Sequence, residues 1–248
     1  MINIYSFQFN NAAFLEWQYI TFKRFLKEEH QLICINNCYD KPHEGEAIRA
    51  MAEKLGIPHY IPNHVDHRAG AGRSHQTALN WAFHNIVDHN NIAIIVDHDM
   101  FPIREFPLYP EYDVISVMQG RGENIKYFHP GIMIIHPSLK DRDQVDFIGT
   151  KIDFHDCDSG GNWHWYLEKH PDLKIKGLSM VNVCNEHENM NVLPPEAREG
   201  YYEGDCIQIC EDFLLHGRGG SNWQQTPENI FNRKNQQIEQ TLNYYLSL

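Results

Sequence analysis

Two aspartates stand at the end of an apolar run, and they are the residues most suited to chemistry. Asp97 and Asp99 follow the run IAIIV at 92–96, with His98 between them. Divalent cations such as Mg²⁺ and Mn²⁺ prefer carboxylate oxygens, and such a pair leaves coordination positions open for phosphate oxygens. A cation held there would stabilise the negative charge that develops on a leaving phosphate. The triplet alone is equally typical of a polar turn after a strand.

A histidine followed by glycines offers a second half for such a site. His216 ends the apolar run FLL and precedes a segment that contains Gly219 and Gly220. A neutral imidazole nitrogen is a metal ligand, and glycine amides can approach oxyanions closely. The sequence therefore predicts that His216 is a third metal ligand and that the glycines contact phosphate. A capped strand end with a flexible loop is the alternative.

The aspartates need a strand that delivers them to an edge, and the first hundred residues predict one. Because IAIIV shows no polar alternation, it is expected to be a strand buried on both faces. Strand-like and helix-like segments alternate before it, which implies an α/β fold with a mostly parallel sheet flanked by helices. Ligands in such folds gather at the carboxyl ends of strands. The predicted strands are 2–9, 31–36 and 59–61. The predicted helices are a segment after Asn10 and Asn11 with Leu15, Tyr19, Phe22 and Leu26 on one stripe, then 44–55, then a segment that begins at Ser74.

The second half of the chain is less regular. Its apolar runs predict four strand regions, a short helix and a terminal helix that begins near Thr226 and carries an apolar stripe. The strand regions are 113–118, 127–137, 178–183 and 206–215, the short helix is 160–170, and the stripe is Phe231, Ile238, Leu242 and Tyr245.

Bulk properties exclude several classes of protein. The 248 residues are taken as a single domain, and a net charge of -12 argues against nucleic acid as a partner. No apolar run is long enough for a membrane span, and the N-terminal segment does not resemble a secretory signal. A cytoplasmic protein is expected, with its oligomeric state left open. The six cysteines form no Cys-x-x-Cys pair, although Cys206 and Cys210 with His216 are a minor alternative as a zinc site.

At this point the sequence resembles glycosyltransferases of the GT-A fold. The motifs IIVDHDM, HPGIMII, DCDSGGNW and HGRGGSNW follow one another between 92 and 223 in the order of the glycogenin-type, family 8 branch. The chain departs from that branch at Ser221 and Asn222, where a lysine and a proline are usual, and at Asp158, where an aspartate-glutamine pair is frequent. The resemblance implies a GT-A, Rossmann-like single domain that transfers a sugar from a UDP- or GDP-linked donor. Mn²⁺ or Mg²⁺ is the implied cofactor, and the resemblance slightly favours retention over inversion.

The resemblance also implies a division of labour along the chain. Residues 1–100 would bind the nucleotide, 101–225 the acceptor and metal, and 226–248 would form a terminal helix. The acceptor would be a hydroxyl group of a glycan, a lipid or a protein. The implied metal ligands are Asp97, Asp99 and His216, and the implied contacts to the nucleotide sugar are Ser6, Phe7, Asn36, Arg73, His98, Gly219 and Gly220.

An acidic loop is the candidate for the catalytic side chain. Asp158 would act as a base toward the acceptor hydroxyl or orient the transferred sugar, and Asp156 would take this role if the register is shifted. The alternative for Asp158 is a helix N-cap. Trp163 and Trp165 would stack on an acceptor sugar, although aromatic residues at helical spacing more often belong to the core.

Two further functions remain open. A metallohydrolase would use His64, Asp66, His67 and His75, which occur close together in the sequence. A non-catalytic module that binds nucleotide sugars is the alternative from another class. Substitutions distinguish the enzymes, because Asp97→Asn and Asp99→Asn should abolish metal-dependent donor binding in a glycosyltransferase but not metal binding in that hydrolase.

Overall fold

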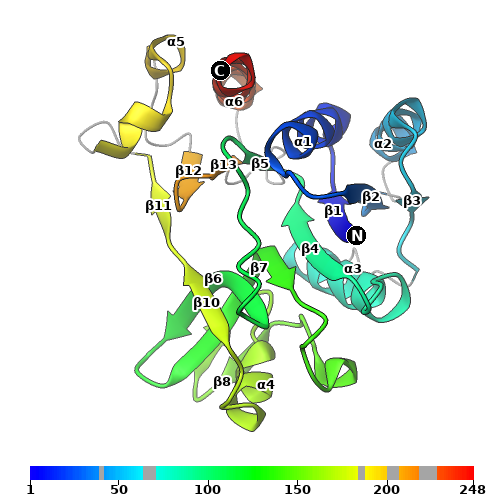
Figure 1. Cartoon of the computed structure of the whole chain (residues 1–248), viewed down its shortest axis with the longest axis vertical. Helices are drawn as coiled ribbons and strands as arrows, with labels where there is room; N and C mark the ends of the chain where they lie inside the picture. Colours follow the sequence, from blue (N-terminus) through cyan, green and yellow to red (C-terminus); the bar gives the residue numbers. More distant parts are fainter. Residues whose placement is uncertain (39–41, 64–70, 184–187, 200–206, 218–227) are drawn as a thin grey trace. The chain divides into compact units, whose positions relative to one another are not determined.

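The computed structural model describes residues 1–38, 42–63, 71–183, 188–199, 207–217 and 228–248 (Figure 1). The chain forms two compact units, and each unit is assembled from separate stretches of sequence. Unit 1 comprises Met1–Leu15, Glu28–Asp97 and Leu108–Leu178, and unit 2 comprises Glu16–Lys27, His98–Pro107 and Ser179–Leu248. Within the described ranges, no helix is long and apolar enough to cross a membrane.

A central sheet organises unit 1. Over the described residues it has seven strands in the order β10-β6-β7-β4-β1-β2-β3. Strand β7 runs antiparallel to both neighbours, and the remaining neighbours pair in parallel. The predicted α/β fold with a mostly parallel sheet flanked by helices is therefore confirmed. The strands are β1 (Ile2–Gln8), β2 (His30–Asn36), β3 (His59–Tyr60), β4 (Ile92–Asp97), β6 (Val114–Arg121), β7 (Ile125–Ile135) and β10 (Ile175–Leu178).

Helices accompany the sheet much as the sequence predicts. The second begins close to its expected start, and the third begins three residues before the expected Ser74. A short helix also lies within the predicted range 160–170. These helices are α1 (Ala12–Phe25), which spans the boundary between the two units, α2 (Pro42–Leu55), α3 (Ala71–Asn85) and α4 (Trp163–Lys169).

Strand β4 is buried on both faces, as its unbroken apolar sequence predicts. Ile95 belongs to a core cluster that also contains Leu79 and Phe83 of α3. Ile94 and Val96 are fully buried as well. Because successive side chains of a strand point to opposite faces, these two fill the other side of the sheet. Asp97, the last residue of β4, is therefore the point at which this buried strand first presents a carboxylate.

The carboxyl ends of three parallel strands meet at one edge of this sheet. The register pairs Phe7 of β1 with Asp97 of β4, and Gln8 of β1 with Asn36 of β2. Ligands of open α/β sheets bind at such an edge. Asn36 and Asp97 are the last residues of β2 and β4, and Phe7 lies one residue before the end of β1.

A small hairpin in unit 1 was not predicted. Strands β8 (Thr150–Ile152) and β9 (His155–Cys157) pair in an antiparallel manner around a turn at Asp153 and Phe154. Both turn residues have a positive φ, 45° and 71°, as two-residue hairpin turns often require. Asn-Gly or Asp-Gly normally signals such a turn, so the Asp-Phe pair gave no warning of it.

Unit 2 contains a second, antiparallel sheet. Its order over the described residues is β11-β12-β13-β5. A long helix, α6 (Glu228–Ser247), follows it in the sequence, and Ile238, Leu242 and Tyr245 of the predicted stripe are buried. The strands are β5 (Met100–Pro102), β11 (Met180–Asn182), β12 (Ile207–Cys210) and β13 (Leu214–Gly217), and the short helix α5 spans Pro195–Arg198.

Candidate functional site

The two aspartates of the motif have different partners. In unit 1, Asp97 Oδ1 lies 2.8 Å from Nε2 of His75, which α3 carries. The ring of Phe7 meets the His75 ring edge-on, with centroids 6.0 Å apart. Both members of the Asp97–His75 pair remain partly accessible to solvent. The Asp97–His75 pair was not anticipated, because it depends on the packing of α3 beside the end of β4.

In unit 2, Asp99 and His216 face each other in a buried setting. Nε2 of His216 lies 3.5 Å from Oδ1 of Asp99, and both residues are buried. The backbone enforces this approach, because β13 pairs with β5 so that His216 lies opposite Met100. In addition, the amide of Gly217 donates to the carbonyl oxygen of Asp99 over 2.8 Å. Residues more than a hundred positions apart in sequence are thus held side by side.

A glutamine orients the imidazole of His216. Nδ1 of His216 lies 2.8 Å from Oε1 of Gln208, and Nε2 of Gln208 donates to Oδ1 of Asn182 over 2.8 Å. Since Oε1 can only accept, Nδ1 carries the proton. Nε2 faces Asp99, to which it donates a hydrogen bond when the ring is protonated, and its lone pair is available to a cation when the ring is neutral. This arrangement is common for histidines that bind metals. Sequence reasoning missed Gln208, because 206–215 was predicted as one strand region, whereas β12 and β13 form a hairpin that places Gln208 opposite His216.

Charge around Asp99 favours its ionised form. Burial by itself raises the pKa of the Asp99 carboxyl. The charges of His216 and His98, a hydrogen bond from His216 and the charge of Lys234 outweigh burial and hold the pKa well below its usual range. His98 is itself buried. Asp99 is therefore a carboxylate in a dry environment, which suits a ligand for a hard cation.

The Asp99–His216 pair fits a divalent cation as part of its coordination sphere. Ligands held about 2.1 Å from one cation lie roughly 3.0 to 3.5 Å apart when they are neighbours, which matches the spacing between the facing atoms. Among the described residues, no group of three or more His, Cys, Asp or Glu side chains is arranged to hold a metal. The described part of unit 2 thus contributes one carboxylate and one imidazole.

The predicted nucleotide contacts at the sheet edge are mostly buried. Ser6 and Phe7 are buried in β1. Asn36 is also buried, where its Nδ2 donates to the carbonyl oxygen of Gly45 over 2.9 Å. Arg73 is exposed on the first turn of α3. The predicted phosphate contacts Gly219 and Gly220 lie outside the described residues, so their roles stay predictions.

The acidic loop before α4 is tightly packed, yet its aspartate is exposed. Asp158 is exposed, and its Oδ1 accepts a hydrogen bond from the amide of Ser159 over 2.7 Å. The N-cap residue of α4 is Asn162, so the alternative of Asp158 as a helix cap is wrong: the loop continues for four residues before the helix begins. Asp156 lies on β9, highly exposed and 4.0 Å from Nζ of Lys151.

The two tryptophans of this region have separate surroundings. Trp163 is fully buried and its ring packs edge-on against those of Phe128 and Tyr166, so it belongs to the core. Trp165 is 52% exposed. It lines a cavity of about 200 Å³ together with Asn162 and Lys169. Of the two, Trp165 alone has a face that a sugar could reach.

The alternative metal sites fall largely outside the described residues. His64, Asp66 and His67 of the hydrolase hypothesis lie there, while His75 contacts Asp97. Cys206 of the zinc alternative lies there as well. Cys210 is buried, and burial raises the pKa of its thiol to about 12. A protonated thiol does not favour metal binding.

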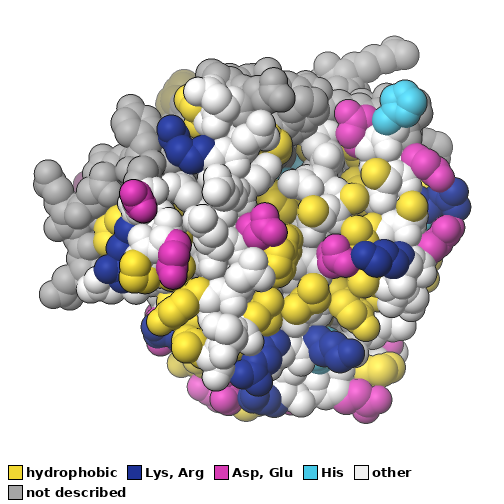
Figure 2. All heavy atoms as spheres, turned by 90° about the horizontal axis from the view of Figure 1, so that it is seen from above, with side chains coloured by type: hydrophobic (Ala, Val, Ile, Leu, Met, Phe, Trp, Pro, Cys, Tyr) yellow, Lys and Arg dark blue, Asp and Glu magenta, His cyan; other side chains and the backbone are white. Residues whose placement is uncertain are grey.

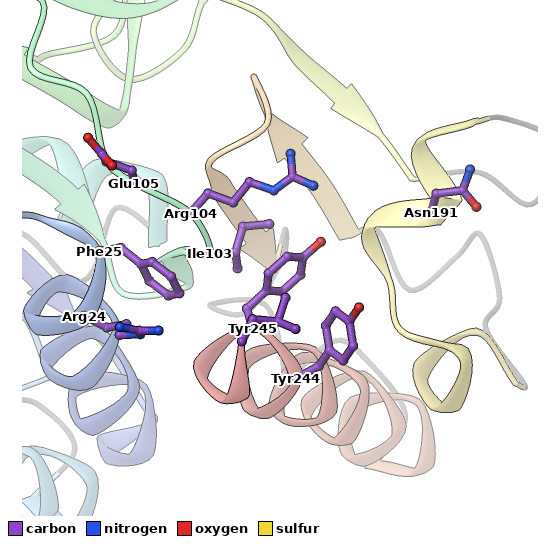
Figure 3. A pocket seen from close by; sticks show the side chains of 9 residues that line it. Arg24, Phe25, Ile103, Arg104, Glu105, Asn191, Tyr244 and Tyr245 are labelled. Carbon is purple, nitrogen blue, oxygen red and sulfur yellow. The ribbon is translucent and has the colours of Figure 1, made fainter.

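A separate hollow in unit 2 is drawn in Figure 3. Its volume is about 370 Å³, and it lies beyond the opposite end of β5 from Asp99. Arg104 stacks over the ring of Tyr245, 5.9 Å from its centroid, and forms an exposed ion pair with Asp212. The lining residues are Arg24, Phe25, Ile103, Arg104, Glu105, Asn191, Tyr244, Tyr245 and Leu248.

Charges on the surface are mixed. On the face shown in Figure 2, Lys and Arg side chains lie among Asp and Glu side chains. For a chain with a net charge of -12, an anionic ligand must therefore be met by local groups. The buried cluster around Asp99 is one place where cationic groups converge.

Comparison with known proteins found similarity in solved structures only. No protein-family model matches the sequence, and no curated protein matches it. One similar structure is a mannosyltransferase from Pyrobaculum calidifontis in complex with GDP-Man and Mn²⁺, with a TM-score of 0.45, 14% identity, and coverage of 71% of this chain and 54% of that one. Another is the galactosyltransferase LgtC in complex with donor and acceptor sugar analogues, with a TM-score of 0.40, 14% identity, and coverage of 70% and 66%. The chain thus spans about half of the first structure and 66% of the second, and both neighbours are glycosyltransferases.

Proposed function

We propose that this chain is a glycosyltransferase that moves a sugar from a UDP- or GDP-linked donor to a hydroxyl group of a glycan, a lipid or a protein. The observation that carries the proposal is the buried Asp99–His216 pair with its orienting Gln208. The sequence alone already predicted that Asp99 of the Asp-His-Asp motif and His216, which precedes the glycines, act together. Mn²⁺ or Mg²⁺ is the proposed cofactor.

Asp99 and His216 would hold the cation, with Asp97 as the further ligand that the motif predicts from its position two residues before Asp99. When bound, the cation supplies a Lewis acid for the leaving diphosphate. Gln208 keeps the His216 lone pair available by accepting the Nδ1 proton in a hydrogen bond. Burial of Asp99 strengthens its attraction for a cation, since few waters compete and the local dielectric constant is low.

Donor recognition is assigned to the edge where β1, β2 and β4 end. Ser6, Phe7 and Asn36 would contact the nucleotide, and Arg73 would reach the diphosphate or the sugar. Arg73 is exposed at the start of α3, where the helix amides also favour an anion. His98 and the glycines at 219 and 220 complete the proposed donor contacts.

The acceptor hydroxyl must lose a proton during transfer. We assign the role of the base that takes this proton to Asp158, whose exposed carboxylate lies in the loop before α4, and Asp156 of β9 is the alternative base. A base of this type contributes about 10² to 10⁴ in rate. Retention at the anomeric carbon is the favoured outcome, and NMR of the product anomer distinguishes it from inversion.

Binding experiments test the proposal directly. Wild-type protein is titrated calorimetrically with UDP and with GDP, in the presence and absence of Mn²⁺. We expect Mn²⁺ to strengthen the binding of one nucleotide, and His216→Ala to remove that gain. Asp212→Asn is the matched control, because it neutralises an exposed carboxylate of the same unit that pairs with Arg104.

Activity assays separate an enzyme from a binding module. UDP- and GDP-sugars are incubated with the protein and Mn²⁺, and release or transfer of the sugar is followed. Metal-enhanced nucleotide binding without any sugar release would favour the non-catalytic module. Indifference to every nucleotide, with or without metal, would contradict both functions.

A further inference from the structure

The terminal helix of unit 2 buries a lysine. Lys234 of α6 is only 7% exposed, and Gln237, Ile238 and Thr241 of the same helix are buried with it. Lysines are almost never buried to this extent unless a charge compensates them. Lys234 falls within the apolar stripe that the sequence predicted for this helix, between Phe231 and Ile238.

Contacts of α6 direct this lysine toward the candidate site. The helix lies against β13 so closely that a Cβ added to Gly217 would lie 2.6 Å from Cδ1 of Ile238. Gly217 directly follows His216, and its amide donates to the carbonyl oxygen of Asp99. Lys234 lies four residues before Ile238 and therefore on the same face of the helix, one turn away. Consistent with this, the charge of Lys234 helps to lower the pKa of Asp99.

We propose that Lys234 binds the diphosphate of the nucleotide donor, beside the cation that Asp99 and His216 hold. This inference rests on the proposed function and adds a residue to it. An ammonium group donates up to three hydrogen bonds, and its bonds to phosphate oxygens are charge-assisted. Lys234 would thus stabilise the diphosphate, which is the leaving group of the proposed reaction, when it binds to unit 2.

Charge balance gives this role a distinctive signature. A divalent cation bound by Asp99 is repelled by the ammonium group of Lys234, so the cation alone binds weakly. A nucleoside diphosphate carries enough negative charge to be attracted by both. The cation and the nucleotide therefore bind cooperatively, and each strengthens the binding of the other by the same factor.

Replacement of Lys234 by methionine should move the two affinities in opposite directions. The variant Lys234→Met keeps most of the side-chain volume, and loss of a buried charge to an apolar group is often tolerated. Calorimetry with Mn²⁺ alone should show several-fold tighter binding, because the repulsion is gone. Calorimetry with UDP or GDP at saturating Mn²⁺ should show binding weaker by about 10- to 100-fold, the usual range for hydrogen bonds between charged groups.

Matched variants make the result specific. Arg233→Met removes a positive charge from the adjacent position, which points about 100° away around the helix, and should change neither affinity by more than about twofold. Lys234→Arg retains the charge and should restore most of the nucleotide binding. Lys234→Gln is the second neutral variant, used in place of the methionine variant if circular dichroism shows that the latter is unfolded.

The outcomes separate this inference from the proposed function. If the wild-type protein binds neither UDP nor GDP in the presence of Mn²⁺, the proposed function fails and the inference fails with it. If the wild-type protein shows metal-enhanced nucleotide binding but a folded neutral variant binds equally well, only the inference is overturned. A neutral variant that weakens Mn²⁺ and nucleotide binding together would show a structural role and would also overturn it.

Discussion

Asp97 and Asp99 are two residues apart in sequence, yet they belong to different units and have different surroundings. The Asp97 side chain is 21% exposed and lies beside His75, which is 24% exposed. The Asp99 side chain is 4% exposed and faces His216, which is 8% exposed. Exposed charge pairs contribute about 0 to 1 kcal/mol, whereas removal of one partner from a buried pair costs about 3 to 5 kcal/mol.

This difference indicates that the two carboxylates would not be equivalent as ligands of the proposed cation. Because water also reaches the Asp97 carboxylate, its contact with His75 can be replaced by a contact with a cation at little cost in free energy. Asp99 is fixed by the backbone of β13, by burial and by the cationic groups around it. We infer that Asp99 supplies the larger part of the affinity for a cation, and that Asp97 is the adjustable ligand.

The largest expected effect comes from neutralising Asp99. Asp99→Asn should weaken Mn²⁺-dependent nucleotide binding by at least about 100-fold, because it removes the anion that the buried cationic groups surround. Asp97→Asn should weaken it by only about 10-fold, because its environment is partly solvated. Calorimetric titration of both variants measures the difference. Equal losses in the two variants would contradict the distinction drawn between the two sites.

One glycine from each unit differs in how much an added methyl group should destabilise the fold. Gly160 of unit 1 has a φ of +87°, and an added Cβ would lie 2.3 Å from the backbone oxygen of Phe128. At Gly217 of unit 2 the close contact would be with the end of the Ile238 side chain, 2.6 Å away, while the backbone oxygen of Asp99 would lie at an ordinary 3.6 Å. Gly160→Ala should therefore reduce the free energy of unfolding by about 3 kcal/mol or more, and Gly217→Ala by about 1 to 3 kcal/mol. Denaturant titration measures both values.

A double variant makes the second of these expectations sharper. Ile238→Val removes the Cδ1 atom that an alanine at 217 would meet. Gly217→Ala combined with Ile238→Val should therefore be more stable than the sum of the single losses predicts. Strict additivity would show that Gly217 is needed for a reason other than close packing against α6.

The fold was largely predictable because its signals are periodic and local. The unbroken apolar run of β4 and the alternation of strands with helices before it predicted the sheet, and the register of β1, β2 and β4 follows from parallel pairing. The hairpin β8–β9 was missed because its turn uses Asp153 and Phe154 in place of the usual glycine. The division into two units was also missed, since each unit combines distant stretches of chain.

The candidate site was only partly predictable. Asp99 and His216 were identified by residue type and motif order, and their facing atoms lie 3.5 Å apart. Their role as metal ligands stays a prediction. Gln208 and Lys234 were overlooked as neighbours of these two residues, because Gln208 lies across a hairpin from His216 and Lys234 approaches through the packing of a helix on a strand. Such partners depend on tertiary contacts, for which local patterns give little guidance. The contact between Asp97 and His75 was missed for the same reason.

A smaller loss of nucleotide binding is expected from disturbing the orientation of His216, which Gln208 holds in the site at Asp99. Gln208→Leu removes the oxygen that accepts from Nδ1 of His216, and this should weaken Mn²⁺-dependent nucleotide binding by about 10-fold. Nitrogen NMR of the His216 ring should show a mixture of tautomers in the variant. Gln31→Leu, at an exposed position of β2, is the control and should leave both measurements unchanged. An unaltered tautomer in Gln208→Leu would mean that Gln208 does not orient His216.

The smallest expected effect concerns a carboxyl of unit 1 that is stabilised mainly by hydrogen bonds, in contrast to the charge cluster around Asp99. Burial raises the pKa of Asp113, but a hydrogen bond from Ser138 and one from the amide of Lys174 over 2.9 Å outweigh it, so the pKa lies below its usual range. Ionised Asp113 therefore stabilises the folded state above about pH 4, the ordinary pKa of an aspartate, and this contribution is lost as the pH falls through the lower folded-state pKa. Asp113→Asn should lower the unfolding free energy at pH 7, where the ionised carboxyl contributes fully, and should flatten the decline of that free energy below about pH 4. Denaturant titrations from pH 2 to pH 7 measure this, and an unchanged acid limb in the variant would show that these hydrogen bonds do not favour the ionised carboxyl.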